Sequence, residues 1–77
     1  MNGWQRDPVT AFIALGANLG DAAVAVRQAA ADLARLPQTV LVATSPLYAS
    51  APVDAQGPDY VNAVAQLATR LSAPDLL

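Results

Sequence analysis

The spacing of the hydrophobic residues changes along this 77-residue chain. Residues 11–15 form a short continuous apolar run, which is typical of a β-strand covered on both faces. Beyond Gly16 the apolar residues recur at the spacing of one helical face. These helical positions are Val26, Ala29, Leu33 and Leu36. Pro37 ends the helix, because a proline disfavours helical geometry in the residue before it.

The segment between this strand and this helix consists of small and turn-forming residues. Asn18 or Asp21 can cap the helix, since short polar side chains accept hydrogen bonds from the first backbone N–H groups. The polar side of the helix carries Arg27, Gln28, Asp32 and Arg35. The pattern thus predicts a strand, a tight turn and one amphipathic helix.

The middle of the chain predicts a second strand over residues 39–45, which are rich in β-branched side chains. Pro46 interrupts it, so residues 47–49 are expected at a sheet edge or past a bulge. Residues 50–59 contain Pro52, Gly57 and Pro58 and are expected to form a loop.

Residues 60–71 show the clearest alternation and predict a third strand. The apolar face of this strand is formed by Val61, Ala63, Ala65, Leu67 and Leu71. The opposite face carries Tyr60, Asn62, Gln66 and Arg70, interrupted by Val64 and Ala68. We expect the first face to pack on helices and the second to meet a ligand or solvent.

The last residues of the chain predict the start of another helix. Ser72 is followed three residues later by Asp75, with Pro74 in the first turn, which is a typical helix start. One turn of helix does not hold itself together. We therefore expect the chain to be part of a longer domain.

Composition limits the chemistry that these residues can perform. The chain has no Cys, His or Lys, which excludes thiolate nucleophiles, zinc–sulfur sites, a histidine base, Schiff bases and a P-loop lysine. The few arginines are scattered, which argues against nucleic acid as a partner. No apolar run approaches the roughly 20 residues of a membrane span. The first ten residues lack the apolar stretch of a signal peptide, so a cytoplasmic protein is expected.

Two loops could bind ligands, and each has a simpler interpretation. The turn 16–21 lies between a strand and a helix, where phosphates are often bound, but its glycines also serve simply to make the turn. Asp54 and Asp59 could be imagined as metal ligands, but aspartates in such loops usually form turns. We expect no metal site in this chain.

Tyr60 and Asn62 are two residues apart on a predicted strand, so their side chains share one face. An aromatic ring for stacking and an amide that donates and accepts suit a flat heterocycle such as a pterin. The alternative is a surface tyrosine and an asparagine that merely begin a strand.

The ordered motifs resemble the amino-terminal part of the pyrophosphokinase family that acts on 6-hydroxymethyl-7,8-dihydropterin in folate synthesis. The matching segments are Leu15-Gly16-Ala17-Asn18-Leu19-Gly20-Asp21, Ser45-Pro46-Leu47-Tyr48, Ser50-Ala51-Pro52-Val53, Asp59-Tyr60-Val61-Asn62-Ala63 and Leu71-Ser72-Ala73-Pro74-Asp75-Leu76-Leu77. The resemblance implies an α+β ferredoxin-like sandwich, here truncated to about three strands and one full helix. Residues 1–9 would be a flexible leader and residues 10–77 the first part of a single domain.

The resemblance also implies an activity and a binding site. Such kinases transfer pyrophosphate from ATP to the hydroxymethyl group of the pterin with two magnesium ions and release AMP. The pterin would stack on Tyr60, and its polar edge would be read by Ser50, Asn62 and the backbone near Val53. The pocket wall would include Gly16, Ala17 and Asn18. The family often has threonine where this chain has Ser50 and a Pro-Pro pair at Ala51-Pro52.

In the family, the magnesium-binding aspartates, the arginines and the ATP-binding segment follow the helix that begins at Ser72. We therefore expect no catalytic residue in this chain and neither ATP nor magnesium bound by it alone. Two other functions remain open: a small ferredoxin-like binding or regulatory module that pairs with a partner or with itself through an open sheet edge, and a structural half-domain without a ligand.

Overall fold

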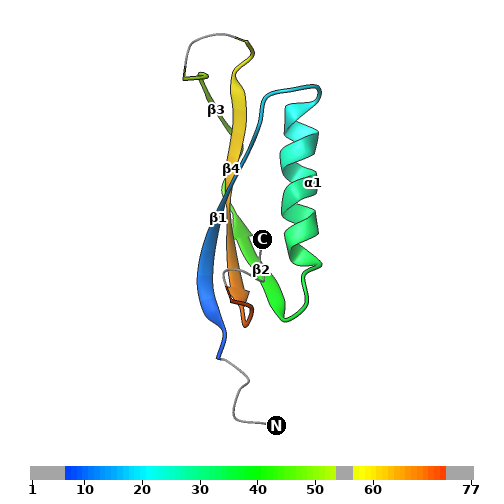
Figure 1. Cartoon of the computed structure of the whole chain (residues 1–77), viewed down its shortest axis with the longest axis vertical. Helices are drawn as coiled ribbons and strands as arrows, with labels where there is room; N and C mark the ends of the chain where they lie inside the picture. Colours follow the sequence, from blue (N-terminus) through cyan, green and yellow to red (C-terminus); the bar gives the residue numbers. More distant parts are fainter. Residues whose placement is uncertain (1–6, 54–56, 73–77) are drawn as a thin grey trace.

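In the part of the chain that the structure describes, one antiparallel sheet carries a single helix on one of its faces (Figure 1). The structure is a computed structural model that describes residues 7–53 and 57–72. In chain order its elements are β1 (Val9–Ala17), α1 (Ala22–Ala34), β2 (Thr39–Thr44), β3 (Tyr48–Ser50) and β4 (Tyr60–Thr69). This arrangement is the truncated α+β ferredoxin-like fold that the resemblance implies, with three long strands and the short β3.

The last of the described strands, β4 (Tyr60–Thr69), is the central strand of the sheet. β4 lies between β1 and β2 and pairs antiparallel with both, while β3 pairs with the beginning of β4. β1 and β2 are therefore parallel to each other, and α1 connects them across one face. This topology explains why β4 is the most deeply buried strand.

The expected element boundaries differ from the observed ones at a few ends. β1 extends the apolar run by two residues on each side, and β4 ends at Thr69, two residues before the expected end. Val9 belongs to β1, while residues 1–6 of the expected leader lie outside the described residues. The helix expected after Ser72 also lies outside them.

The core lies between α1 and the central strand. Val26 of α1 and three residues of β4 (Ala63, Ala65, Leu67) are buried, which confirms that the apolar face of this strand packs on a helix. Thr69 continues the same face and is also buried, but its hydroxyl is satisfied. Its Oγ1 lies 2.8 Å from Oγ1 of Thr39 and accepts the backbone N–H of Leu71 over 3.1 Å. A buried hydroxyl without such partners would destabilise the fold.

The opposite face of the sheet has no helix over it in the described part of the chain. The expectation that residues 11–15 form a strand covered on both faces is wrong here: Phe12 is 67% exposed and Ala14 is also exposed. Ile13 and Leu15, which point the other way, are half-buried towards α1. The reason is that one helix can cover only one face of a sheet. We call the uncovered side the open face.

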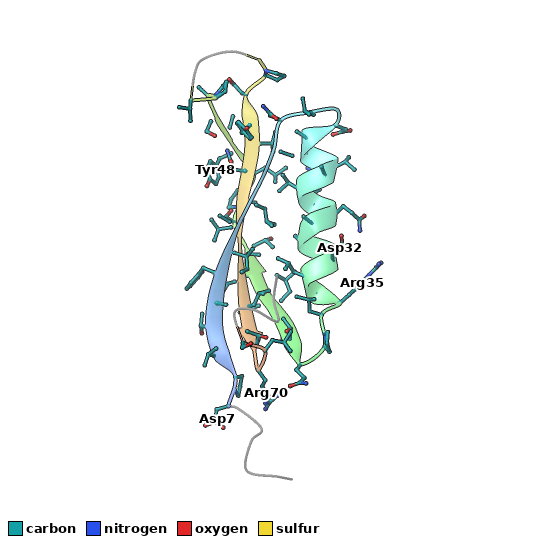
Figure 2. The ribbon with its side chains drawn as sticks, in the orientation of Figure 1. Asp7, Asp32, Arg35, Tyr48 and Arg70 are labelled. Atoms are coloured by element: carbon teal, nitrogen blue, oxygen red, sulfur yellow. The ribbon has the colours of Figure 1, made fainter. Side chains whose placement is uncertain are left out.

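Asp21 caps α1, which settles the choice between two predicted caps. Its Oδ1 accepts the backbone N–H of Val24 over 3.2 Å. The polar side of the helix faces solvent as predicted, and Figure 2 shows Asp32 and Arg35 pointing away from the sheet. No helix among the described residues is long and apolar enough to cross a membrane.

Ser45 and Pro46 separate β2 from β3. Proline has no backbone N–H to donate to a neighbouring strand, so it breaks the ladder as predicted. Ser45 bridges the break: its N–H donates to the carbonyl of Val64 over 2.8 Å, and its Oγ accepts the N–H of Val64 over 2.8 Å. After this break the chain pairs with β4 again as β3, which contributes Ser50 to the candidate site.

Candidate functional site

The polar residues of the predicted site gather on the open face, at the end of the sheet where β4 begins. Asn62 on β4 lies directly opposite Gly16 on β1 and Tyr48 on β3. Tyr60, two residues earlier on β4, lies opposite Ser50. Cross-strand partners point to the same side of a sheet. Four of the predicted residues (Gly16, Ser50, Tyr60, Asn62) are thus brought together on one surface.

The amide of Asn62 is held by hydrogen bonds to β3. Its Nδ2 donates to Oγ of Ser50 over 2.8 Å and to the carbonyl oxygen of Tyr48 over 3.3 Å. Both hydrogens of the NH₂ group therefore have protein acceptors, and Oδ1 keeps its lone pairs for another partner. The reverse amide orientation would place Oδ1 against the Tyr48 carbonyl, where two acceptors would repel each other.

Tyr60 offers an aromatic ring beside this amide. The residue is 38% exposed, and its hydroxyl-bearing ring lies on the same face as Asn62. A partly exposed ring can stack with a flat heterocycle without first being uncovered. Ring and amide together can hold a planar ligand by one face and one edge.

Asn18 lies at the rim of this site. Its Nδ2 donates to the carbonyl oxygen of Pro58 over 3.4 Å, which joins the turn after β1 to the segment that leads into Tyr60. The bond joins residues that are 40 positions apart in the sequence. It holds together the two segments that adjoin the same end of the β1–β4 pair.

Two predicted site residues are placed differently. Ala17 pairs with Val61, so its side chain points to the helix-covered face, opposite to Asn62. The side chain of Val53 is fully exposed and follows β3 in a turn. The role predicted for Val53 was recognition of the ligand by its backbone, and not by its side chain.

Tyr48 is a site residue that the sequence analysis did not assign. Its carbonyl oxygen accepts from Asn62, and its side chain is about half exposed on the open face, away from α1 (Figure 2). The available signal was the two-residue spacing between Tyr48 and Ser50, which places both on one side of a strand. Pro46 obscures that signal, because it makes the segment resemble an interrupted strand end.

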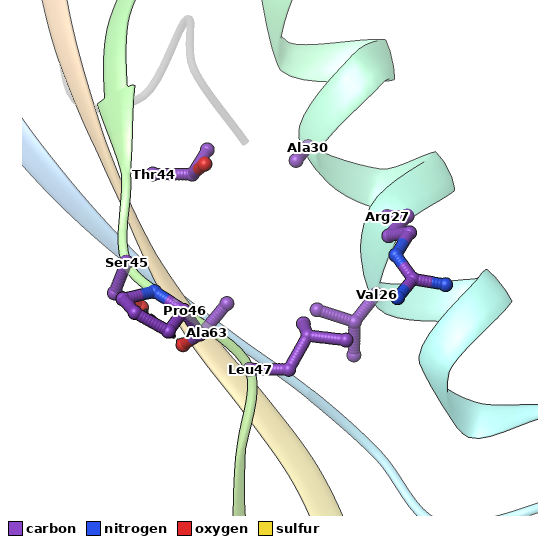
Figure 3. A pocket seen from close by; sticks show the side chains of 8 residues that line it. All are labelled: Val26, Arg27, Ala30, Thr44, Ser45, Pro46, Leu47 and Ala63. Atoms are coloured by element: carbon purple, nitrogen blue, oxygen red, sulfur yellow. Dashed lines mark hydrogen bonds between the residues drawn. The ribbon is translucent and has the colours of Figure 1, made fainter.

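Two cavities formed by described residues are not lined by the polar residues of the site. One, of about 220 Å³, lies between α1 and residues 45–47 (Figure 3). The other, of about 210 Å³, lies on the open face and is lined by Phe12, Val64 and Gln66 among others. Val64 is the next residue on the face after Asn62, so this second hollow continues the surface that Asn62 occupies. A ligand stacked on a flat sheet needs no deep cavity, and the site is defined by its hydrogen bonds.

The site is electrically neutral. Gly16, Tyr48, Ser50, Tyr60 and Asn62 provide hydroxyl, amide and carbonyl groups and no charged side chain. In residues 7–53 and 57–72, no group of three or more His, Cys, Asp or Glu side chains could hold a metal ion. This arrangement can recognise an uncharged planar molecule through stacking and directional hydrogen bonds.

Comparisons with known proteins agree with the resemblance seen in the motifs. The family model described as 7,8-dihydro-6-hydroxymethylpterin-pyrophosphokinase matches residues 12–77. A 2-amino-4-hydroxy-6-hydroxymethyldihydropteridine pyrophosphokinase of Haemophilus influenzae is 46% identical over 70 residues, which cover 90% of this chain and 44% of that protein. The protein of the same name from Pseudomonas aeruginosa is 46% identical over 67 residues, covering 86% of this chain and 41% of its own length. The chain thus spans less than half the length of these curated relatives.

Proposed function

This chain belongs to the 7,8-dihydro-6-hydroxymethylpterin-pyrophosphokinase family, and on that premise we propose that it forms the pterin-binding part of a folate-synthesis kinase. The whole enzyme would transfer pyrophosphate from ATP to the hydroxymethyl group of 6-hydroxymethyl-7,8-dihydropterin and release AMP. The observation that carries the proposal is the fixed amide of Asn62 beside the ring of Tyr60 on the open face.

The polar groups of the site match the lactam edge of a pterin, where a carbonyl oxygen lies next to a ring N–H. Ser50 receives a hydrogen bond from Asn62 at its Oγ, so its own O–H can donate to the ligand's carbonyl. Oδ1 of Asn62 can accept the adjacent ring N–H. The heterocycle would then stack on Tyr60. One donor and one acceptor in a fixed order discriminate this edge from one with the reverse pattern.

Pyrophosphate transfer requires more than this site provides. Magnesium ions and cationic side chains would neutralise the charge that develops on the transferred group. The described residues contain no donor set for a metal, so we derive no catalytic step from them. We propose that this chain alone binds the pterin and does not transfer pyrophosphate. Release of AMP from a mixture of this chain, ATP, Mg²⁺ and the dihydropterin would contradict that statement.

An amide NMR titration with 6-hydroxymethyl-7,8-dihydropterin tests the proposal. The expected result is a set of shift changes confined to Ser50, Val53, Tyr60, Asn62 and their neighbours. A variant with Asn62→Ala should lose most of these changes, whereas Arg35→Ala, on the far side of α1, should keep them. Well-dispersed spectra that do not respond to the ligand would overturn pterin binding by this chain.

A second function, pairing through an open sheet edge, is supported by the composition of β1. Among the described strands β1 pairs only with β4, and Val9–Ala17 contains no charged residue and no proline. Natural edge strands usually carry charges or prolines that prevent pairing with other chains. Phe12 adds an exposed aromatic ring to this edge. The partner that suits an uncharged edge of this kind is a second copy of the chain.

Light scattering over a range of protein concentrations tests this second function. We expect a mass that rises with concentration for the unaltered chain and a constant monomer mass for Phe12→Lys. The matched control is Val24→Lys, because Val24 is also an exposed apolar residue but lies on α1 and not on an edge strand. A strictly monomeric chain at high concentration would exclude pairing.

A further inference from the structure

Gly16 lies beneath the amide of Asn62, and a side chain between them would be in tight contact with the amide. A Cβ added at Gly16 would lie 3.1 Å from Oδ1 of Asn62 and 3.9 Å from Cδ1 of Tyr60. The first distance is shorter than an ordinary van der Waals contact, so the amide would have to move. Any residue larger than glycine would therefore disturb the group that faces the ligand.

The backbone itself does not require glycine at this position. Gly20 and Gly57 have φ angles of 61° and 77°, which side chains rarely adopt. Gly16 is not among the residues with positive φ and continues the regular pairing of β1 with Asn62. The reason for a glycine here is consequently the space that it leaves above the sheet.

The Asn62 amide cannot easily avoid a new methyl group by turning. Its NH₂ group is held on the β3 side by Ser50 and by the Tyr48 carbonyl, so Oδ1 is directed towards β1. Turning the amide away from Gly16 would strain these two bonds, of which the one to the Tyr48 carbonyl is already long at 3.3 Å. The oxygen that remains available to a ligand is thus the atom nearest to the vacant Cβ position.

We propose that Gly16 is a positioning residue that determines specificity: by lacking a side chain, it keeps Oδ1 of Asn62 presented to a ring N–H of the ligand. This inference rests on the proposed pterin site. The proposed site consists of residues that would touch the heterocycle. Gly16 would instead set the direction in which the acceptor oxygen of Asn62 points. The ligands selected are planar heterocycles with an N–H donor next to a carbonyl.

A double-mutant cycle without ligand tests the steric part of the inference. Urea unfolding is measured for the unaltered chain, Gly16→Ala, Asn62→Ala and the double variant. Gly16→Ala should lower the unfolding midpoint when Asn62 is present. In the Asn62→Ala background it should leave the midpoint unchanged or raise it, because alanine restricts the unfolded chain more than glycine does.

Gly20→Ala is the matched control for this cycle. Its cost arises from the positive φ angle and should be the same with or without Asn62. An equal loss from Gly16→Ala in both backgrounds, or no loss in either, would overturn the inference.

If a variant does not fold, the side-chain NH₂ signals of Asn62 in the remaining folded variants supply the same test. They should shift in Gly16→Ala while those of Asn18 stay in place.

Ligand binding separates this inference from the proposed function. The probe is 6-hydroxymethylpterin, compared with its N3-methyl derivative, which lacks the ring N–H. We expect Gly16→Ala to weaken binding of the first by roughly tenfold, the effect of about one lost hydrogen bond, and to change binding of the second little. If the unaltered chain binds neither probe, the proposed function fails. If it binds the first and Gly16→Ala binds it equally well, only the positioning role of Gly16 fails.

Discussion

Asn62 on β4 donates a hydrogen bond of 2.8 Å to the hydroxyl of Ser50 on β3, a residue twelve positions earlier in the sequence. The bond joins the central strand to a strand of only three residues. The two groups that would read a ligand's edge are therefore positioned by each other. Changes at either residue should affect both the ligand and the attachment of β3.

Replacement of Ser50 by alanine removes an acceptor from the NH₂ group of Asn62 and a donor from the site. We expect a loss of stability of about 0.5–1 kcal/mol, since the bond is exposed, and a roughly tenfold weaker pterin affinity. Urea unfolding and isothermal titration calorimetry measure the two effects. Ser50→Thr keeps the hydroxyl and should bind nearly as the unaltered chain does. Equal affinities for the alanine and threonine variants would show that the hydroxyl is not used.

Tyr60 is expected to contribute its ring and not its hydroxyl. Tyr60→Ala removes the stacking surface and should weaken pterin binding by at least roughly 2- to 12-fold, because aromatic pairs contribute about 0.5–1.5 kcal/mol beyond the area that they bury. Tyr60→Phe keeps the ring and should change the affinity by less than about twofold. Fluorescence titration with 6-hydroxymethylpterin measures both. A phenylalanine variant as weak as the alanine variant would instead assign the binding to the phenol oxygen.

The hydrogen bond from Val24 to Asp21 predicts a helix-capping effect that is independent of any ligand. Asp21→Ala leaves this backbone N–H without its side-chain acceptor and should destabilise the chain by about 1 kcal/mol. Asp21→Asn retains a good cap and should lose only a few tenths. Urea unfolding followed by circular dichroism at 222 nm compares the variants. If both substitutions lower the free energy of unfolding by the same amount, the negative charge at the start of the helix matters and the cap geometry does not.

Leu67 is the largest side chain in the core, and its removal tests how much stability this small fold has. Leu67→Ala should cost about 2–5 kcal/mol, which approaches the entire stability of a small domain. We therefore expect the dispersion of the amide NMR spectrum to collapse. The control Val40→Ala, at an exposed position of β2, should change stability by no more than about 0.5 kcal/mol. A dispersed spectrum for Leu67→Ala would mean that the fold is supported by other contacts.

Local signals in the sequence were sufficient for much of the fold and for the identity of the family. The helical spacing of Val26, Ala29 and Leu33, with Pro37 beyond them, located α1 because neighbours on a helix are only a few residues apart. The alternation from Val61 to Leu67 identified the buried face of β4 for the same reason. The order of the motifs, from Gly16 to Asn62, indicated the family before any comparison, and the family model confirmed it.

Residue spacing was enough to locate the strands and the helix, but the contacts between these elements depend on how distant parts of the chain pair. That β4 lies between β1 and β2, that Tyr48 lies beside Asn62, and that Phe12 is left uncovered all follow from the pairing of distant strands. Pairing and register are set by contacts between residues far apart in the chain, which no local pattern records. The amide of Asn62 shows this most directly: its residue type predicted a donor and an acceptor, while the hydrogen bonds to Ser50 and Tyr48 direct the acceptor towards Gly16.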